Sequence, residues 1–154
     1  MEFSEHEKLI EIGRNLASEA PEDWLRIEVD VFMLAEVSTS SVEVFKEDGS
    51  REFFDIPFSA SMAFRELREG MHTAEYGTWF SAQYSLEKPG RFKVEYDYDN
   101  EPPFPYPLDS ERYANDYLKF PRALENIPEW LFGKFEECKR RERERIEDSN
   151  QEDQ

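Results

Sequence analysis

The sequence predicts an α+β domain, built from an antiparallel sheet of about five strands with helices packed mainly on one face. The first observation is a pair of runs between residues 77 and 99 in which apolar residues recur at every second position, the period of a strand. The second is that residues 4–20 and 59–74 carry apolar residues at helical spacing. A length of 154 residues suits one domain with its own core.

The runs between residues 77 and 99 form a predicted central hairpin. They are separated by Pro89 and Gly90, and glycine accepts the positive φ that a tight reversal requires. One face of the second run carries Phe92, Val94, Tyr96 and Tyr98, and the other carries Arg91, Lys93, Glu95, Asp97 and Asp99. In the first run the expected buried face is Phe80, Ala82, Tyr84 and Leu86, alternating with Trp79, Ser81, Gln83 and Ser85. The sheet should therefore have an aromatic inner face and a polar outer face.

A helix and a long strand precede this hairpin. Ser4 stands three residues before Glu7, which is the spacing of a helix cap, and the predicted helix covers residues 4–20. A strand over residues 24–37 follows, because apolar and charged residues alternate there. Phe32 and Leu34 make its second half apolar on both faces, which predicts a strand covered on both sides or an edge packed by a neighbour.

A second hairpin and a second helix are predicted next. Residues 38–41 are a polar break, and residues 42–46 and 52–56 are short strands joined at Asp48-Gly49. The helix over residues 59–74 has an apolar stripe of Ala60, Phe64, Leu67 and Met71, with Arg65, Glu66, Arg68 and Glu69 expected elsewhere on its surface.

The last third of the chain starts with four prolines within residues 100–108, which favour an extended surface connection. Phe104 and Tyr106 should hold it against the body. One helix is expected from Asp109 toward Phe120, and a last one starts near Pro128. We predict a single domain over residues 1–138 and a charged tail over residues 139–154, in which the helix continues but frays.

The charge balance restricts the classes of partner. The chain has 36 acidic and 19 basic residues, a net charge of −17. This field repels nucleic acid and anionic lipid and attracts basic proteins, although high solubility alone would also explain it. The basic run at residues 139–145 is interleaved with glutamates and does not indicate nucleic-acid binding.

Few residues suggest catalysis or a cofactor. His6 and His72 stand alone on predicted helices, so no zinc site is expected, and neither a nucleophile motif nor a phosphate-binding loop is present. The single Cys138 suits a reducing compartment. Because no signal peptide or membrane span is recognisable, a cytoplasmic protein is expected. Because no catalytic motif is recognisable, we do not expect an enzyme.

The one notable cluster is formed by Glu95, Asp97, Asp99 and Glu101. Three interpretations remain open: a solvated strand face, an acidic docking surface for a basic partner, or a metal site. Along one strand face the first three carboxylates would be spaced about 6.6 Å apart, which is wide for a shared metal ion.

Several short segments in order resemble the YezG-like immunity proteins. They are Gly77-Thr78-Trp79, residues 90–99, residues 113–117, Phe120-Pro121-Arg122 and Trp130. The resemblance extends by pattern back to Trp24 and implies a small cytoplasmic antitoxin of a bacterial polymorphic-toxin system, which binds and blocks a toxin whose active domain is typically a nuclease.

The resulting hypothesis is an immunity protein that neutralises a basic nuclease domain without a cofactor. The proposed toxin-binding residues are Glu95, Asp97, Asp99 and Glu101, with Trp79 as an aromatic anchor. These residues follow from the expected facing of the strand, and Trp79 is equally compatible with the core. The alternatives are a metal-dependent hydrolase that uses Asp97 and Asp99, or a non-catalytic interaction module. Oligomeric state is left open.

Overall fold

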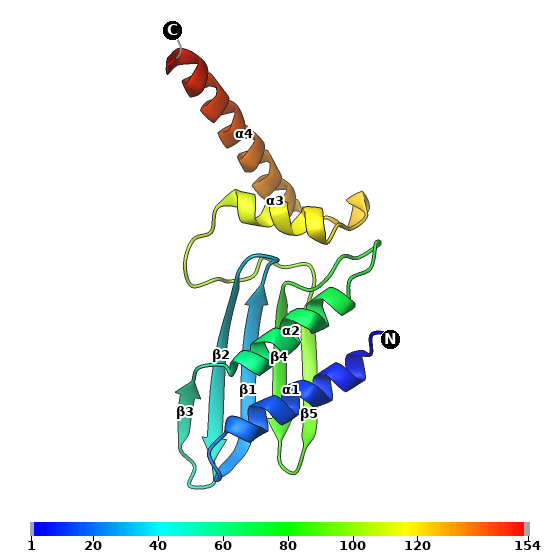
Figure 1. Cartoon of the computed structure of the whole chain (residues 1–154), viewed down its shortest axis with the longest axis vertical. Helices are drawn as coiled ribbons and strands as arrows, with labels where there is room; N and C mark the ends of the chain where they lie inside the picture. The colour runs from blue at the N-terminus through cyan, green and yellow to red at the C-terminus, as the bar shows by residue number, and fades with distance from the viewer. Residues whose placement is uncertain (1, 153–154) are drawn as a thin grey trace.

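A computed structural model describes residues 2–152 and has an α+β fold. The elements in chain order are α1 (Glu5–Glu19), β1 (Trp24–Met33), β2 (Ser38–Lys46), β3 (Arg51–Phe54), α2 (Phe58–Gly70), β4 (Ser81–Glu87), β5 (Arg91–Asp97), α3 (Ser110–Lys119), a 3-10 turn (Leu124–Asn126) and α4 (Glu129–Glu152). The five strands form one antiparallel sheet in the order β3-β2-β1-β4-β5. Helices α1 and α2 cross one face of it, whereas α3 and α4 lie at one end (Figure 1). The predicted fold class is confirmed.

The local signals that start and reverse the chain are those the sequence predicts. The amide of Glu7 donates to Oγ of Ser4 at the start of α1. Gly49 has φ +84° in the β2–β3 turn, and Oδ1 of Asp48 accepts from the amide of Ser50. Gly90 also has a positive φ, in the β4–β5 turn.

The larger hydrophobic cluster lies between the sheet and helices α1 and α2, and α1 approaches the sheet closely at Gly13. Tyr84 on β4 donates from its hydroxyl to the carbonyl of Leu9, and its ring lies edge-on to Phe64 of α2. An added Cβ on Gly13 would lie 2.7 Å from that hydroxyl. The pattern of apolar residues in both helices and in β1, β2 and β4 therefore produces one continuous core.

A second, smaller cluster lies at the end of the sheet where α3 and α4 pack. Its buried members are Leu34, Phe80, Tyr113, Ile127 and Leu131. Phe32 projects beside Phe104 of the proline-rich segment, with ring centroids 6.1 Å apart, and the hydroxyls of Thr39 and Tyr106 are hydrogen-bonded at 2.7 Å. This packing explains why the second half of β1 is apolar on both faces and confirms that Phe104 and Tyr106 hold the segment down.

Buried charged residues join the two clusters. Nη1 and Nη2 of Arg68 donate to the two carboxylate oxygens of Asp116, at 2.7 and 3.0 Å, and Nε donates to the carbonyl of Trp79. Asp116 also accepts from the amide of Ala35. Nη2 of Arg122 donates to the carbonyl of Tyr98, and burial lowers the pKa of this guanidinium. These bonds attach α3 and the following turn to the sheet.

Several local predictions are wrong, and one of them is the end of the second helix, which stops at Gly70 and not at residue 74. Arg68 was expected on the solvated side of α2, but it is buried because Asp116 neutralises it. Residues 38–41 belong to β2, since they pair with the end of β1. The strand predicted over residues 24–37 ends at Met33, and its alternation fails at Leu25, which is exposed because the pairing register shifts between Trp24 and Arg26. Phe80 packs in the small cluster and not on the buried side of β4, because it precedes the strand.

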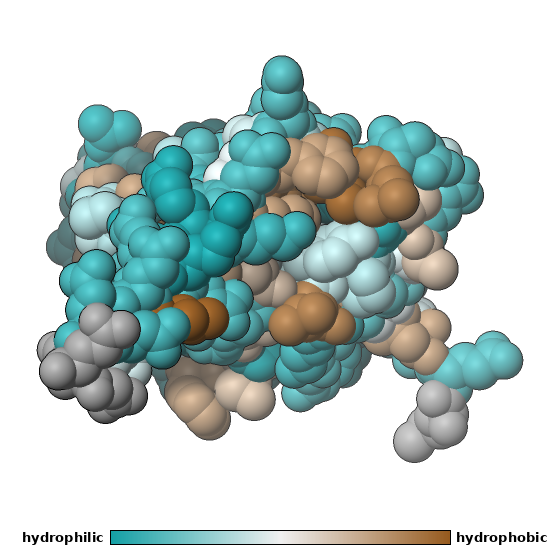
Figure 2. Space-filling model, turned by 90° about the horizontal axis from the view of Figure 1, so that it is seen from above, coloured by the Kyte–Doolittle hydropathy of each residue, from teal (hydrophilic) through white to brown (hydrophobic). Residues whose placement is uncertain are grey.

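Helix α4 begins after Pro128 as predicted, extends away from the body and carries the charged stretch from residue 139 as far as Glu152. Its fraying stays a prediction, and residues 153–154 lie outside the described part. Seen from the α4 end, the surface is mostly hydrophilic, with hydrophobic residues in separate patches (Figure 2).

Candidate functional site

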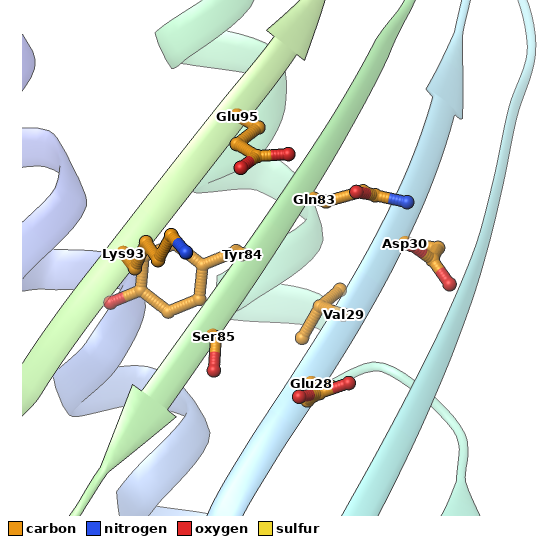
Figure 3. Close-up of a pocket in the computed structure, with 8 residues that line it drawn as sticks. All are labelled: Glu28, Val29, Asp30, Gln83, Tyr84, Ser85, Lys93 and Glu95. Carbon is orange, nitrogen blue, oxygen red and sulfur yellow. The ribbon is translucent and has the colours of Figure 1, made fainter.

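The face of the sheet opposite α1 and α2 carries polar side chains from three neighbouring strands (Figure 3). We name this set the open face, and it comprises Glu28, Asp30, Gln83, Ser85, Lys93 and Glu95. Val29 and Tyr84, the apolar neighbours in sequence, point to the opposite side, into the core. The alternation of a strand thus separates a buried side from a solvated one.

The strand order brings these residues together. Asp30 is opposite Gln83, and Gln83 is opposite Glu95, so the two carboxylates flank one amide on adjacent strands. Two strand spacings put the Cα atoms of Asp30 and Glu95 about 10 Å apart. The open face surrounds a shallow hollow of about 330 Å³.

Charge is graded along the outer side of the sheet. At the end near the β4–β5 turn lie the cations Arg26, Arg51 and Arg91, and there Arg26 and Arg51 pair with Glu28 and Glu43 at 3.2 and 3.3 Å. Toward α3, Asp30 and Glu95 have no cationic nitrogen within 4 Å among the described residues. The acidic half of this face is therefore available to an external cation.

The predicted carboxylates do not form one row. Glu95 lies on the open face, whereas β5 ends at Asp97 and the chain bends after it. The side-chain amide of Asn100 donates to Asp97, and the amides of Asn100 and Asp99 also donate to it. These hydrogen bonds, chiefly that from the Asn100 side chain, lower the pKa of Asp97. Asp97 therefore organises a turn beside the open face.

The other two predicted carboxylates contact the α3–α4 end. The side chain of Asp99 is 81% exposed and lies 3.5 Å from Nη1 of Arg122, while its carbonyl accepts from Nε1 of Trp130. Glu101 pairs with Lys134 of α4 at 3.1 Å. Both residues thus have partners in the protein, although their carboxylates remain partly accessible.

Trp79 is fully buried in the large cluster and stacks on Tyr96 at a centroid distance of 5.9 Å. The anchor interpretation of Trp79 is therefore corrected in favour of the core interpretation: its indole contributes no surface to a partner in this conformation. The reason is that Trp79 and Phe80 precede β4, which begins at Ser81, so the alternation of the strand does not extend to them, and both rings are buried, in different clusters.

Sequence reasoning missed Glu28, Asp30 and Gln83 as members of the site. The alternation of charged and apolar residues in residues 24–33 marks the outward side chains, but only the pairing of β1 with β4 shows that they adjoin Glu95. Tyr106, which is partly exposed and bonded to Thr39, adds an aromatic group held against β2.

The histidines and the acidic residues are potential ligands of a metal ion. Within residues 2–152, no group of three or more His, Cys, Asp or Glu side chains is placed to hold a metal ion. His72 contacts the carbonyl of Pro121 through Nε2, and the ring of His6 packs near Phe92. In the same part of the chain, no helix has the length and apolar character needed to cross a membrane.

One family model matches the chain. Its description is "Immunity protein YezG-like", and it matches residues 46–129, slightly more than half of the sequence. The matched part runs from the end of β2 to the start of α4, and it includes Glu95, Asp97, Asp99 and Glu101 but not β1. It starts later than the sequence resemblance, which extended to Trp24. No curated protein matches the chain.

Proposed function

The chain belongs to the YezG-like immunity protein family, and from this premise we propose that it binds and neutralises a cognate toxin domain of the basic nuclease class through the open face. The observation that carries the proposal is the helix-free sheet surface on which Asp30 and Glu95 lie exposed, with no cationic nitrogen of residues 2–152 within 4 Å of either carboxylate. The partner therefore supplies the countercharge.

A nuclease is the class of toxin that fits this charge. It binds a polyanionic substrate and so has a basic surface. A net charge of −17 attracts such a surface over a distance and raises the association rate by roughly 10- to 1,000-fold at low salt. Rapid capture suits an inhibitor that must act before its target does.

Charge alone speeds the encounter of the two proteins, whereas a high affinity also needs a contact from which water is excluded. The hollow between β1, β4 and β5 offers Gln83 and Ser85 as hydrogen-bonding groups between the carboxylates. Tyr106 offers an aromatic anchor held by its bond to Thr39. In our proposal a toxin Lys or Arg enters the hollow between Asp30 and Glu95. Asp97, Asp99 and Glu101 extend the acidic rim toward α3, and Trp79 supports β4 and β5 from the core side.

A charge-reversal pair tests this proposal. Asp30→Lys with Glu95→Lys is compared with Glu7→Lys and Glu69→Lys, which alter exposed residues of α1 and α2. Both double variants change the net charge by the same amount. We expect the first to lose rescue from the co-expressed toxin and to raise the Kd at least about 100-fold, as desolvated charge pairs do. The second should lower only the association rate.

If both double variants lost toxin binding to the same extent, the net charge would act without a defined surface. Retained rescue in the open-face variant would place the toxin contact elsewhere. Failure of the unaltered protein to relieve any toxin encoded beside it would remove the immunity role itself. Binding that is insensitive to ionic strength would instead favour a general interaction module.

A further inference from the structure

Strand β3 forms one edge of the sheet, and no other element of the described part of the chain lies beyond it (Figure 1). All four of its residues are exposed. Phe53 is 72% exposed and Phe58, just after the strand, is 80% exposed. Phe54 is exposed as well. Three exposed phenylalanines therefore lie in this edge strand or shortly after it, and exposed apolar surface of this kind marks an interaction site.

The opposite edge of the sheet is protected in the usual way. The outward side chains of β5 are Arg91, Lys93, Glu95 and Asp97, which discourage pairing with another strand. On the outer side of β3 stand Arg51 and Phe53, and Asp55 follows directly after the strand, which ends at Phe54. An aromatic residue thus lies between two residues of opposite charge in the sequence. The two edges therefore differ in their capacity to add a strand.

The backbone of β3 is oriented for such an addition. The amide of Lys46 donates to the carbonyl of Ser50, and the next pair along the ladder is Phe45 opposite Arg51. Because hydrogen-bonded and non-bonded pairs alternate along antiparallel strands, Glu52 and Phe54 bond to β2. The peptide groups of Arg51 and Phe53 consequently point away from the sheet.

We propose that β3 pairs antiparallel with β3 of a second copy of this chain, about a two-fold axis through Phe53. In this register Phe53 is opposite its own symmetry mate, and Arg51 is opposite Asp55 of the partner subunit. Symmetry repeats that contact, so the dimer gains two ion pairs and one aromatic pair on the same side of a ten-stranded sheet. In this register the positive charge of Arg51 in each copy meets the negative charge of Asp55 of the partner subunit.

Neighbouring registers lack this complementarity. An axis through Phe54 sets Phe53 against Asp55 of the partner subunit and Arg51 against a proline, which has no amide hydrogen to donate. An axis through Glu52 sets Arg51 against Phe53 of the partner subunit and leaves Asp55 near the turn. Only the register through Phe53 pairs opposite charges and places outward-facing peptide groups at its centre.

The contact area sets the expected strength. The three phenylalanines expose roughly 400 Å² per copy, which is about half the area that one partner contributes to a standard interface. Two copies with a charge of −17 also repel each other, although salt at 0.15 M screens that repulsion beyond about 8 Å. The dimer should therefore be reversible and should form at micromolar concentrations.

Sedimentation velocity between about 1 and about 200 µM in physiological salt tests the proposal through a charge swap. Arg51→Asp and Asp55→Arg each place like charges opposite one another, and either should weaken the self-association at least about tenfold. The double variant R51D/D55R restores opposite charges in an isologous interface. It should associate within about threefold of the unaltered protein.

The double variant is decisive because it contains both single changes, including the loss of the Arg51 contact with Glu43. Phe53→Glu should abolish the dimer, whereas Phe132→Glu, at an exposed phenylalanine of α4, should not. A protein that stays monomeric throughout, or a double variant as weak as the singles, would overturn the proposal. So would loss of toxin neutralisation in Phe53→Glu with an unchanged monomeric mass, because the toxin would then occupy this edge.

Discussion

Among the described residues, the cluster under α1 and α2 contains eighteen buried apolar residues and the cluster under α3 and α4 contains five. The large cluster is made by regular alternation in strands and regular spacing in helices. The small one is attached to it through Arg68, Asp116 and Arg122, three buried charged residues. This difference shows that hydrophobic periodicity builds the first part of the domain, whereas specific polar contacts position the second.

The largest effect is expected at the junction. Asp116→Ala leaves the buried guanidinium of Arg68 without its carboxylate, which should lower the free energy of unfolding by about 3–5 kcal/mol. Urea denaturation followed by circular dichroism measures it. Asp109→Ala removes a carboxylate that stands at the N-cap position of the same helix without a capping hydrogen bond and pairs with Arg141 at the surface, so it should cost about 1 kcal/mol or less. Similar losses in both variants would mean that the junction is not what joins the clusters.

A matched leucine truncation in each cluster sharpens the comparison. Leu67→Ala opens a cavity in the fully packed large cluster and should cost about 4 kcal/mol. Leu131→Ala, in the small cluster, should cost about 2–3 kcal/mol, because α4 can relax toward the space. Hydrogen exchange should show faster opening of α3 and α4 alone in the second variant. Global opening in both would indicate a single cooperative core.

Replacing either of two helical glycines with alanine should change the stability of the protein, in opposite directions. Gly13→Ala places a methyl group against the buried hydroxyl of Tyr84 and should destabilise the protein by about 1–2 kcal/mol. Gly133→Ala meets nothing within 4 Å and should stabilise it by about 0.5–1 kcal/mol, since alanine is the better helix former. Thermal denaturation measures both changes. Stabilisation by Gly13→Ala would show that α1 can move away from β4 without cost.

The smallest effect concerns the turn at Asp97, next to the segment that Arg122 and Trp130 hold. Its hydrogen bonds lower the pKa of the carboxyl below 3.8. They therefore stabilise the folded state fully at a pH above 3.8, and this stabilisation is lost as the pH falls through the lowered pKa. Asp97→Asn should cost about 0.5 kcal/mol near neutral pH. The difference from the unaltered protein should shrink as the pH falls below about 4. If the difference in stability between the two proteins did not depend on pH, the effect would come from the packing of the side chain and not from its charge.

The outer surface of the sheet was only partly predictable. The outward facing of Glu95 follows from alternation alone, because side chains in a strand point to opposite faces at every second residue. Its approach to Asp30 depends on β1 lying beside β4, a contact between segments more than fifty residues apart. Asp99 lost its expected alignment with Glu95 and Asp97 because the strand ends at Asp97, where Asn100 closes a turn.

The sequence by itself determined the class of fold, the hairpins and the helix starts, because these depend on spacing, caps and turn residues within a few positions of one another. Only the tertiary structure decided that Arg68 and Trp79 are buried and that Asp30 adjoins Glu95. Burial of a charge or an indole is set by which distant residue meets it. The partner of Arg68 is Asp116, which is forty-eight positions away in the sequence, so a pattern of neighbouring residues cannot predict that the two side chains meet.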